Sequence, residues 1–366
     1  MSAKVAAARR QRLTSVMAGS GIDYLLVYGN AWQIDYLRYT TDFGILEGEA
    51  LTLVSRDGEV TLFVDSALEA ERARHETKDI DVVYAAEMLK AVENRLESLA
   101  QLRIGVAPKR LMPQRIAART GDLKLGDATT LMDHLLMVKL DCEIEAIRMA
   151  AHIADEGYAV FRNAAREGRR DYELIAEVEA FFRANGADDN FMIIGVGGAE
   201  VRGMSPPMGK VMRRGDMVTT ELTPCIDGYY IQICRTLVIG APSQAQQKAF
   251  GVFRDALEAG IAAVKPGATA ADVARAENEV FRRHDLGDYV TNAYTRVRGH
   301  GLGLFVDTKP HILEDVATAI EASMTMIVHP NTYHPEVGYL VLGDAVIAGQ
   351  TGAEVLTRTP RELFAV

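Results

Sequence analysis

The sequence has few cysteines, no long apolar run and no excess of positive charge. Its three cysteines, Cys142, Cys225 and Cys234, are widely spaced and form no CxxC pair. This spacing excludes a disulfide framework or a cysteine zinc site, so we expect buried free thiols. No apolar run approaches the ~18 residues of a membrane span. No apolar signal core of ~7–15 residues follows the basic N-terminal segment, and we therefore expect a cytoplasmic protein.

Charge and length limit the classes of protein that remain. Acidic residues number 50 against 40 Lys and Arg, which gives a net charge of −10. A chain this acidic is unsuited to phosphate backbones and anionic membranes, so neither nucleic acid nor membrane is expected as a partner. A hydrophobic content of 48% is typical of globular chains and excludes disorder. At ~150 residues per domain, 366 residues predict two domains.

The first third of the chain alternates between helix and strand patterns, which is typical of an α/β layer. The patterns predict helices at 6–18, 66–75 and 85–101, and strands at 24–28, 50–55, 59–64 and 103–106. Asp57 and Gly58 separate the second and third of these strands and predict a hairpin turn.

Near residue 138 the pattern changes to long helices followed by strands. Helices are predicted at 141–166, 171–185, 243–264 and 270–284, and strands at 191–196, 217–222, 229–238 and within 325–356. Asp141 and Thr269 are the expected N-caps of the first and last helices. Helices grouped beside antiparallel strands indicate an α+β domain, and the halves 143–240 and 243–356 suggest an internal repeat.

Several short stretches after Lys139 carry a family resemblance. They are residues 139–148, Gly215 and Asp216, 228–230 with Arg235 and Thr236, 265–267, the glycine-rich segment 299–304, and Pro330, Tyr333 and Asp344. Their order and spacing resemble the creatinase/aminopeptidase P/methionine aminopeptidase family, which has the pita-bread fold. The resemblance implies an α/β N-terminal domain of the creatinase/prolidase type over 1–138. It implies an α+β pita-bread catalytic domain over 139–366.

The resemblance also locates the metal ligands of the family. Metal-dependent members bind two divalent ions with two Asp, one His and two Glu. The corresponding residues in this sequence are Glu221, Gln232, His300, His329 and Gly343. A pair of divalent ions needs bridging anionic oxygens, and one carboxylate does not supply them. We therefore expect no dinuclear centre and no cofactor.

Two further family positions differ. Met204 stands where creatinase has its catalytic histidine, which argues against creatine itself as the substrate. Asp307 stands where the peptidase members have a second histidine.

If the fold is right, His300, His329, Glu221 and Asp307 share one pocket. Polar residues are a costly way to fill a dry space, so their presence favours a working acid–base site. His300 is the expected central imidazole, and His329 is the expected base or oxyanion donor. Glu221 is expected to orient a histidine or activate water, and Asp307, together with Gln232, to hold polar groups of the substrate.

Other side chains are expected to contact the substrate. They are Gln232, Tyr230, His334, Arg202, Arg296 and Met204. Arg202 and Arg296 are candidates to hold a carboxylate through a bidentate pair. Tyr229 and Tyr230 alternate along a strand, so only one can reach the site.

These features predict a homodimeric creatinase-like hydrolase that acts on a C–N bond, amide, amidino or ureido, of a small polar substrate. Three alternatives stay open. One is a Xaa-Pro-type peptidase with a single metal on Glu221, His300 and His329. The others are a lyase acting on a small substrate and a non-catalytic protein that binds peptides or other ligands.

Overall fold

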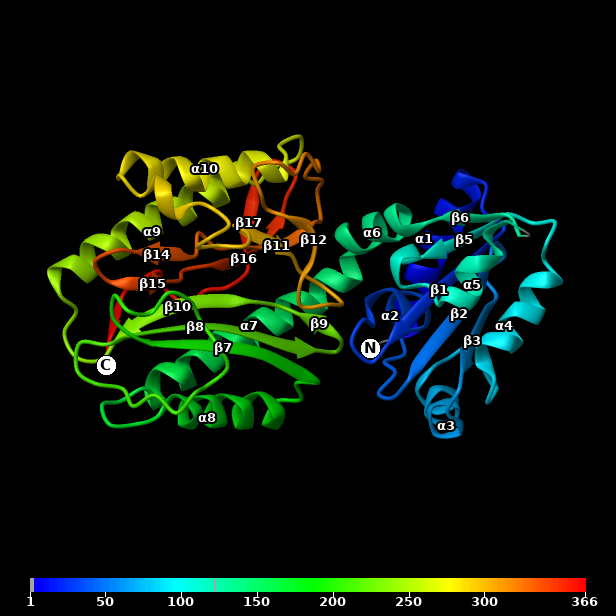
Figure 1. Cartoon of the computed structure of the whole chain (residues 1–366), viewed down its shortest axis with the longest axis horizontal. Coiled ribbons are helices and arrows are strands. Elements are labelled where there is room, and N and C mark those ends of the chain that lie inside the picture. Colours follow the sequence, from blue (N-terminus) through cyan, green and yellow to red (C-terminus); the bar gives the residue numbers. More distant parts are fainter. Residues whose placement is uncertain (1–2, 122) are drawn as a thin grey trace. The chain divides into compact units, whose positions relative to one another are not determined.

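A computed structural model describes residues 3–121 and 123–366 of the chain. The chain divides into two compact units, with the boundary between Leu136 and Met137 (Figure 1). Within the described residues, every helix is too short or too polar to cross a membrane.

The first unit is built on a six-stranded mixed sheet with the order β4-β3-β2-β1-β5-β6. Its strands are β1 (Tyr24–Asn30), β2 (Glu49–Ser55), β3 (Val60–Val64), β4 (Asp81–Tyr84), β5 (Ile104–Ala107) and β6 (Leu125–Asp127). The predicted hairpin is confirmed, because β2 pairs antiparallel with β3 and Gly58 between them has a φ of +90° that suits glycine. The pairs β3–β4, β1–β5 and β5–β6 are parallel.

Helices flank this sheet. They are α1 (Ala3–Ser20), α2 (Asp35–Thr41), α3 (Ala67–Glu76), α4 (Met88–Glu97), α5 (Gln114–Ala117) and α6 (Thr129–Met137), with 3-10 turns η1 (Lys109–Leu111) and η2 (Ala118–Gly121). The helix predicted at 85–101 is shorter than expected. Apolar side chains from both layers form the cores, including Leu26, Phe63 and Leu96 in one cluster and Leu37 and Val64 in another. The α/β class of this unit is confirmed.

The second unit contains two pairs of long helices. They are α7 (Asp141–Ala164) with α8 (Asp171–Ala184), and α9 (Gln244–Ala263) with α10 (Ala270–Arg283), followed by η3 (Gly287–Tyr289). Thr269 caps α10 as predicted, because its side chain accepts a hydrogen bond from the Asp272 backbone N–H. The prediction for Asp141 is wrong. Leu140 is the N-cap of α7, and its backbone N–H donates to the Glu143 carboxylate at 2.8 Å.

The strands of the second unit form two five-stranded sheets and one short ribbon. They are β7 (Asp189–Gly197), β8 (Met217–Ile226), β9 (Tyr229–Tyr230), β10 (Ile233–Val238), β11 (Gly299–Gly301), β12 (Thr308–His311), β13 (Thr325–Val328), β14 (Thr332–His334), β15 (Gly338–Leu340), β16 (Asp344–Ala348), β17 (Ala353–Val355) and β18 (Phe364–Ala365). One sheet has the order β18-β10-β8-β7 with β9 beside β8, and the other has the order β12-β11-β13-β16-β17. The strand predicted at 229–238 is interrupted at Ile231 and Gln232.

Each sheet is covered by one pair of helices. Figure 1 shows α8 and α10 on opposite outer sides of the unit, with the strands between them. Helix α7 packs on β8 and β10, and α9 packs on β13. The two sheets are joined where Cys234 and Gly343 exchange backbone hydrogen bonds of 3.2 and 3.0 Å. The α+β class of the second unit is confirmed.

Candidate active site

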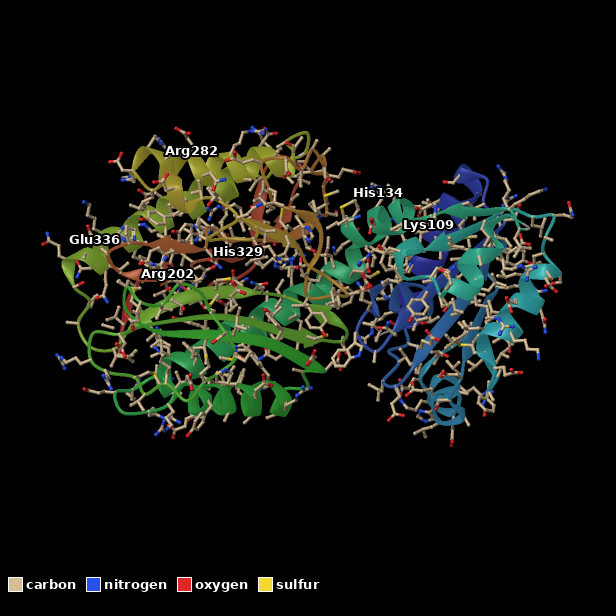
Figure 2. All side chains as sticks on the ribbon, in the orientation of Figure 1. Lys109, His134, Arg202, Arg282, His329 and Glu336 are labelled. Atoms are coloured by element: carbon tan, nitrogen blue, oxygen red, sulfur yellow. The ribbon has the colours of Figure 1, made fainter. Side chains whose placement is uncertain are left out.

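A cavity of about 570 Å³ lies in the second unit, where residues from both sheets meet. Eight of the residues expected at the site line it, namely Arg202, Met204, Glu221, Gln232, Arg296, His300, Asp307 and His329. Glu221 comes from β8, His300 from β11, and His329 from the segment that follows β13. Figure 2 labels His329 and Arg202 in the second unit.

Glycines on both sides of His300 allow neighbouring strands to approach its backbone. A Cβ atom at Gly299 would lie 2.1 Å from the Ile327 carbonyl oxygen, and one at Gly301 would lie 2.0 Å from the Lys309 carbonyl oxygen. Gly299 also has a φ of +144°. Only glycine fits these two positions, and the close packing leaves the His300 residue 6% exposed.

The contacts of His300 indicate which ring nitrogen carries the proton. Nδ1 lies 3.0 Å from the Gly301 carbonyl oxygen, which can only accept, so we assign the proton to Nδ1. Nε2 is then an acceptor. Burial lowers the pKa of His300, and the Asp307 carboxylate, 3.8 Å from Nδ1, opposes that shift.

His329 is 5% exposed and packs edge to face against His300, with ring centroids 5.6 Å apart. Its Nδ1 has no hydrogen-bond partner among the described residues. Burial and the neighbouring His300 lower the pKa of His329 to about 3. The ring is therefore neutral at physiological pH and holds an unused polar atom.

Glu221 is half-buried, and its Oε1 accepts a hydrogen bond of 2.8 Å from the Asn331 amide. Burial raises the pKa of Glu221 to about 7, although hydrogen bonds with Asn331 and Cys234 act in the opposite direction. A carboxyl group with this pKa is present in both protonation states near neutral pH, so it can either donate or accept a proton.

Asp307 is held as an anion. Burial by itself would raise the pKa of Asp307, but a hydrogen bond from His311, the charge of His300 and a hydrogen bond from Arg296 together hold it well below its usual value. The His311 Nε2 lies 3.1 Å from Asp307 Oδ1, and the Arg296 guanidinium pairs with Oδ2. Arg296 therefore already has a carboxylate partner within the protein.

Arg202 is held differently. Its guanidinium lies 4.7 Å from the centre of the Tyr333 ring, and the Tyr333 hydroxyl donates to the Ala199 carbonyl at 2.9 Å. Gln232 is 3% exposed, and its amide donates to Cys234 Sγ at 3.4 Å.

Two residues expected to contact the substrate, Tyr230 and His334, are absent from the lining of the cavity. The Tyr230 hydroxyl donates to Asp189 at 2.8 Å, and Tyr229 donates to Glu143 at 2.9 Å. Both tyrosines lie in β9, and neither lines the cavity. His334 also lies outside the cavity wall, and its Nδ1 accepts from the Glu336 N–H at 3.2 Å.

Several lining residues could not be identified from the sequence patterns, among them Asn331, Tyr339 and Tyr294. Burial and the nearby Glu221 raise the pKa of Tyr339, so its hydroxyl stays protonated. The sequence offered one signal for them: Asn331 stands two residues after His329, so it could be expected near the same pocket.

The donor atoms do not suit a pair of divalent ions. In the described part of the chain, no three His, Cys, Asp or Glu side chains are grouped so that they could hold a metal. A Cβ atom added at Gly343 would lie 2.6 Å from the His329 Cβ. His329 therefore occupies the space that a carboxylate at position 343 would need.

Comparison with known proteins supports the resemblance. The chain matches metallopeptidase family M24 over residues 145–350 and the creatinase/prolidase N-terminal domain over residues 9–138. It is 27% identical to an Xaa-Pro dipeptidase of Pyrococcus furiosus over 97% of this chain and 99% of that protein. It is 25% identical to the uncharacterized peptidase YqhT of Bacillus subtilis over 97% of this chain and 99% of that one.

Solved structures show the same architecture. An Xaa-Pro dipeptidase from Bacillus anthracis has a TM-score of 0.84 at 24% identity and covers 99% of this chain and 100% of its own. The prolidase from Pyrococcus furiosus has a TM-score of 0.80 at 26% identity, over 95% of this chain and 99% of its own. The predicted combination of a creatinase/prolidase N-terminal domain and a pita-bread domain is confirmed. The matched families place the chain among hydrolases of C–N bonds, as the sequence predicted.

Proposed function

We propose that this chain, which belongs to metallopeptidase family M24, hydrolyses a C–N bond of a small polar substrate with its own acid and base. The substrate class is an amide, amidino or ureido compound, and short peptides fall within it. In this proposal no pair of metal ions takes part.

The observation that carries the proposal is the chemistry of the five positions that hold metal in related enzymes. Glu221 is the one carboxylate among them, His329 fills the space beside Gly343, and Gln232 is a neutral amide. Two divalent ions would repel each other without bridging anions. The pKa of Glu221, raised to about 7 by burial, suits proton transfer instead.

The residues of the cavity can complete a balanced hydrolysis. A water molecule gives its proton to Nε2 of His300 as its oxygen attacks the carbonyl, amidino or ureido carbon. The resulting imidazolium is stabilised by the Asp307 anion, 3.8 Å from Nδ1. The C–N bond then breaks, and the leaving nitrogen takes the proton of the Glu221 carboxyl group. Transfer of a proton from His300 to Glu221 restores the starting state.

Other groups in the wall suit substrate binding. Tyr339 keeps its proton and can donate to a developing oxyanion, and Arg202 and Gln232 offer donors to polar substrate groups. General acid–base catalysis supplies about 10²–10⁴ in rate, so positioning and oxyanion stabilisation must supply the remainder. A cavity of about 570 Å³ fits a small substrate.

The proposal is tested by screening the purified protein against Xaa-Pro dipeptides, N-acyl amino acids, guanidino acids and ureido acids. We expect turnover that resists a chelator and is lost in Glu221→Gln and in His300→Asn. Reaction in H₂¹⁸O distinguishes hydrolysis, which places the label in the product, from elimination, which does not. Binding of a compound without turnover would favour the non-catalytic alternative.

A second candidate is a peptidase with one metal ion, and the unpartnered Nδ1 of buried His329 beside His300 is the observation that favours it. Glu221, His300 and His329 are the residues that would hold the ion, and they would have to move closer together to do so, because no three such side chains are grouped for a metal in the described part of the chain. Activity that disappears with a chelator and returns with Zn²⁺ or Mn²⁺ would favour this candidate. The expected homodimer and cytoplasmic location stay predictions.

A further inference from the structure

Two groups of the candidate site lie on one tight turn. In the 329–331 turn, made of His329, Pro330 and Asn331, the Asn331 N–H donates to the His329 carbonyl at 2.7 Å. The Asn331 side chain is held at both ends, since its amide nitrogen donates to Glu221 and its oxygen accepts from the Leu342 N–H at 3.1 Å. The position of this turn therefore fixes both the His329 ring and the hydrogen bond to Glu221.

Arg298 holds the turn at its two ends. The Arg298 carbonyl oxygen accepts from the His329 N–H at 3.0 Å, and its Nη1 donates to the Asn331 carbonyl oxygen at 3.0 Å. Arg298 is 2% exposed and is absent from the lining of the cavity. Arg298 therefore contacts the backbone of His329 and Asn331 on the side away from the cavity and does not face the substrate.

The other side of Arg298 is anchored to helix α10. Its Nε donates to Asn278 Oδ1 at 2.5 Å, and its guanidinium lies 5.2 Å from the centre of the Phe281 ring. Glu277, on the same helix, is completely buried. Burial raises the pKa of its carboxyl group well above the usual value, and the nearby charge of Arg298 opposes that shift. Gly260 of α9 leaves room for that carboxylate, because a Cβ atom there would lie 2.5 Å from Glu277 Oε1.

We propose that Arg298 is a positioning residue that ties helix α10 to the 329–331 turn and so places Asn331 against Glu221 and the His329 ring beside His300. The catalytic consequence rests on the function proposed above, whereas the placement itself does not. Arginine suits this position because its planar fork bonds in two fixed directions at once, which a lysine ammonium on a flexible stem does not. Buried ionisable side chains such as Arg298 and Glu277 rarely make a protein more stable than apolar side chains of similar size would. A gain in stability therefore does not account for a buried arginine here, and a positioning role does.

The test compares three variants with the full-length protein. Arg298→Gln combined with Glu277→Gln replaces both buried ionisable groups with neutral amides, so that neither is left as a buried charge without the other. Arg298→Lys keeps the charge and loses the fork. Arg282→Gln is the control, since Arg282 also lies on α10, is exposed and pairs with Glu314 at 2.6 Å (Figure 2). The readouts are the histidine ring resonances in NMR spectra, with His329 assigned from His329→Gln, and kcat and KM on the best substrate of the screen.

We expect the double variant to fold, to shift the His329 resonances, and to lower kcat about tenfold or more with KM changed less than about threefold. Arg298→Lys should show the same pattern, and Arg282→Gln should match the wild type. Unchanged His329 resonances and kcat in the folded double variant would overturn the inference. If no compound of the screen is turned over, shifted resonances still support the positioning role and count only against the proposed function.

Discussion

Two groups of buried charged or titratable residues lie side by side in the second unit, and they have opposite character. Arg235 and Asp344 are 0% and 1% exposed and are joined at 2.7 Å. Arg235 also donates to the carbonyls of Gly343 and Thr359 at 2.6 Å, and Asp344 accepts from Thr357 and Arg361. Most of the polar atoms in this pair have partners.

By contrast, two titratable residues of the cavity, His329 and Glu221, have few hydrogen-bond partners. His329 has an unpartnered Nδ1, and Glu221 relies on Asn331 and Cys234. The pKa values follow this difference. Arg235 and Arg361 overcome the effect of burial and keep the pKa of Asp344 low, whereas burial prevails at Glu221.

The two groups adjoin the same backbone segments, because Cys234 pairs with Glu221 across β10 and β8 and Gly343 lies against the Cβ of His329. Cys234 and Arg235 are successive residues, as are Gly343 and Asp344, and successive residues of extended chain point to opposite sides. One side thus holds the two sheets together, while the other keeps groups that can exchange protons. Perturbed and underpartnered titratable groups are typical of functional sites, and this comparison distinguishes them from structural ion pairs.

The largest expected effect is on stability, at the structural pair. Asp344→Asn leaves the Arg235 charge buried without its counterion and should lower the free energy of unfolding by about 3–5 kcal/mol. Urea unfolding measures this change. The matched control is Glu354→Gln, which breaks the exposed pair with Arg148 and should cost less than about 1 kcal/mol. Equal losses in the two variants would contradict the distinction.

At the cavity, the largest expected effect is on activity. Glu221→Gln keeps an oxygen for the Asn331 amide but cannot transfer a proton, so kcat should fall by about 10²–10⁴. The free energy of unfolding, measured in urea at pH 7, should change by less than about 1 kcal/mol. The carboxyl group is already poorly solvated in the folded protein, so replacing it with an amide of similar size removes little stabilisation. A large loss of stability with little loss of kcat would assign Glu221 to the structural group.

The pH dependence of stability should separate the two titrating groups of the cavity. Burial raises the pKa of Glu221 from 4.5 to about 7, so its contribution is full below pH 4.5 and is lost as pH rises to about 7. His329, with its pKa lowered from 6.5 to about 3, has the opposite sign, and its contribution is lost as pH falls below 6.5.

The comparison of wild type with Glu221→Gln isolates the first of these contributions. The difference between their free energies of unfolding should decline by on the order of 3 kcal/mol from pH 4.5 to 7 and then stay level. Urea titrations across this range measure it. A difference that does not vary with pH would mean that Glu221 ionises normally in the folded protein.

The smallest effects are expected at the two residues that lie outside the cavity wall. Tyr230→Phe and His334→Gln should each change kcat/KM by less than about twofold, because surface substitutions away from the site alter little. Initial rates on any substrate of the screen measure this. A tenfold loss of kcat/KM in either variant would mean that the residue contacts the substrate after all.

Much of the fold could be predicted because its long helices and the Asp-Gly hairpin follow local rules. Short elements such as α2, β4 and β6 carry too little periodicity to be recognised, and they depend on packing in the sheet. The site was predictable at Glu221, His300 and His329 through the spacing of the family motifs. Asn331 and Tyr339 could not be found in this way, because Asn331 lies in the segment after β13 and Tyr339 on β15 of the short ribbon, and only the tertiary fold brings them to the cavity that Glu221 lines.

The central claim is that the cavity works as an acid–base site without two metal ions, and metal content tests it most directly. Elemental mass spectrometry would be applied to the untagged protein before and after incubation with Zn²⁺ and Mn²⁺, with activity measured on the same samples. We predict less than about a tenth of an equivalent per chain, no uptake and unchanged activity. Two equivalents bound per chain, with activity that follows metal content, would contradict the account.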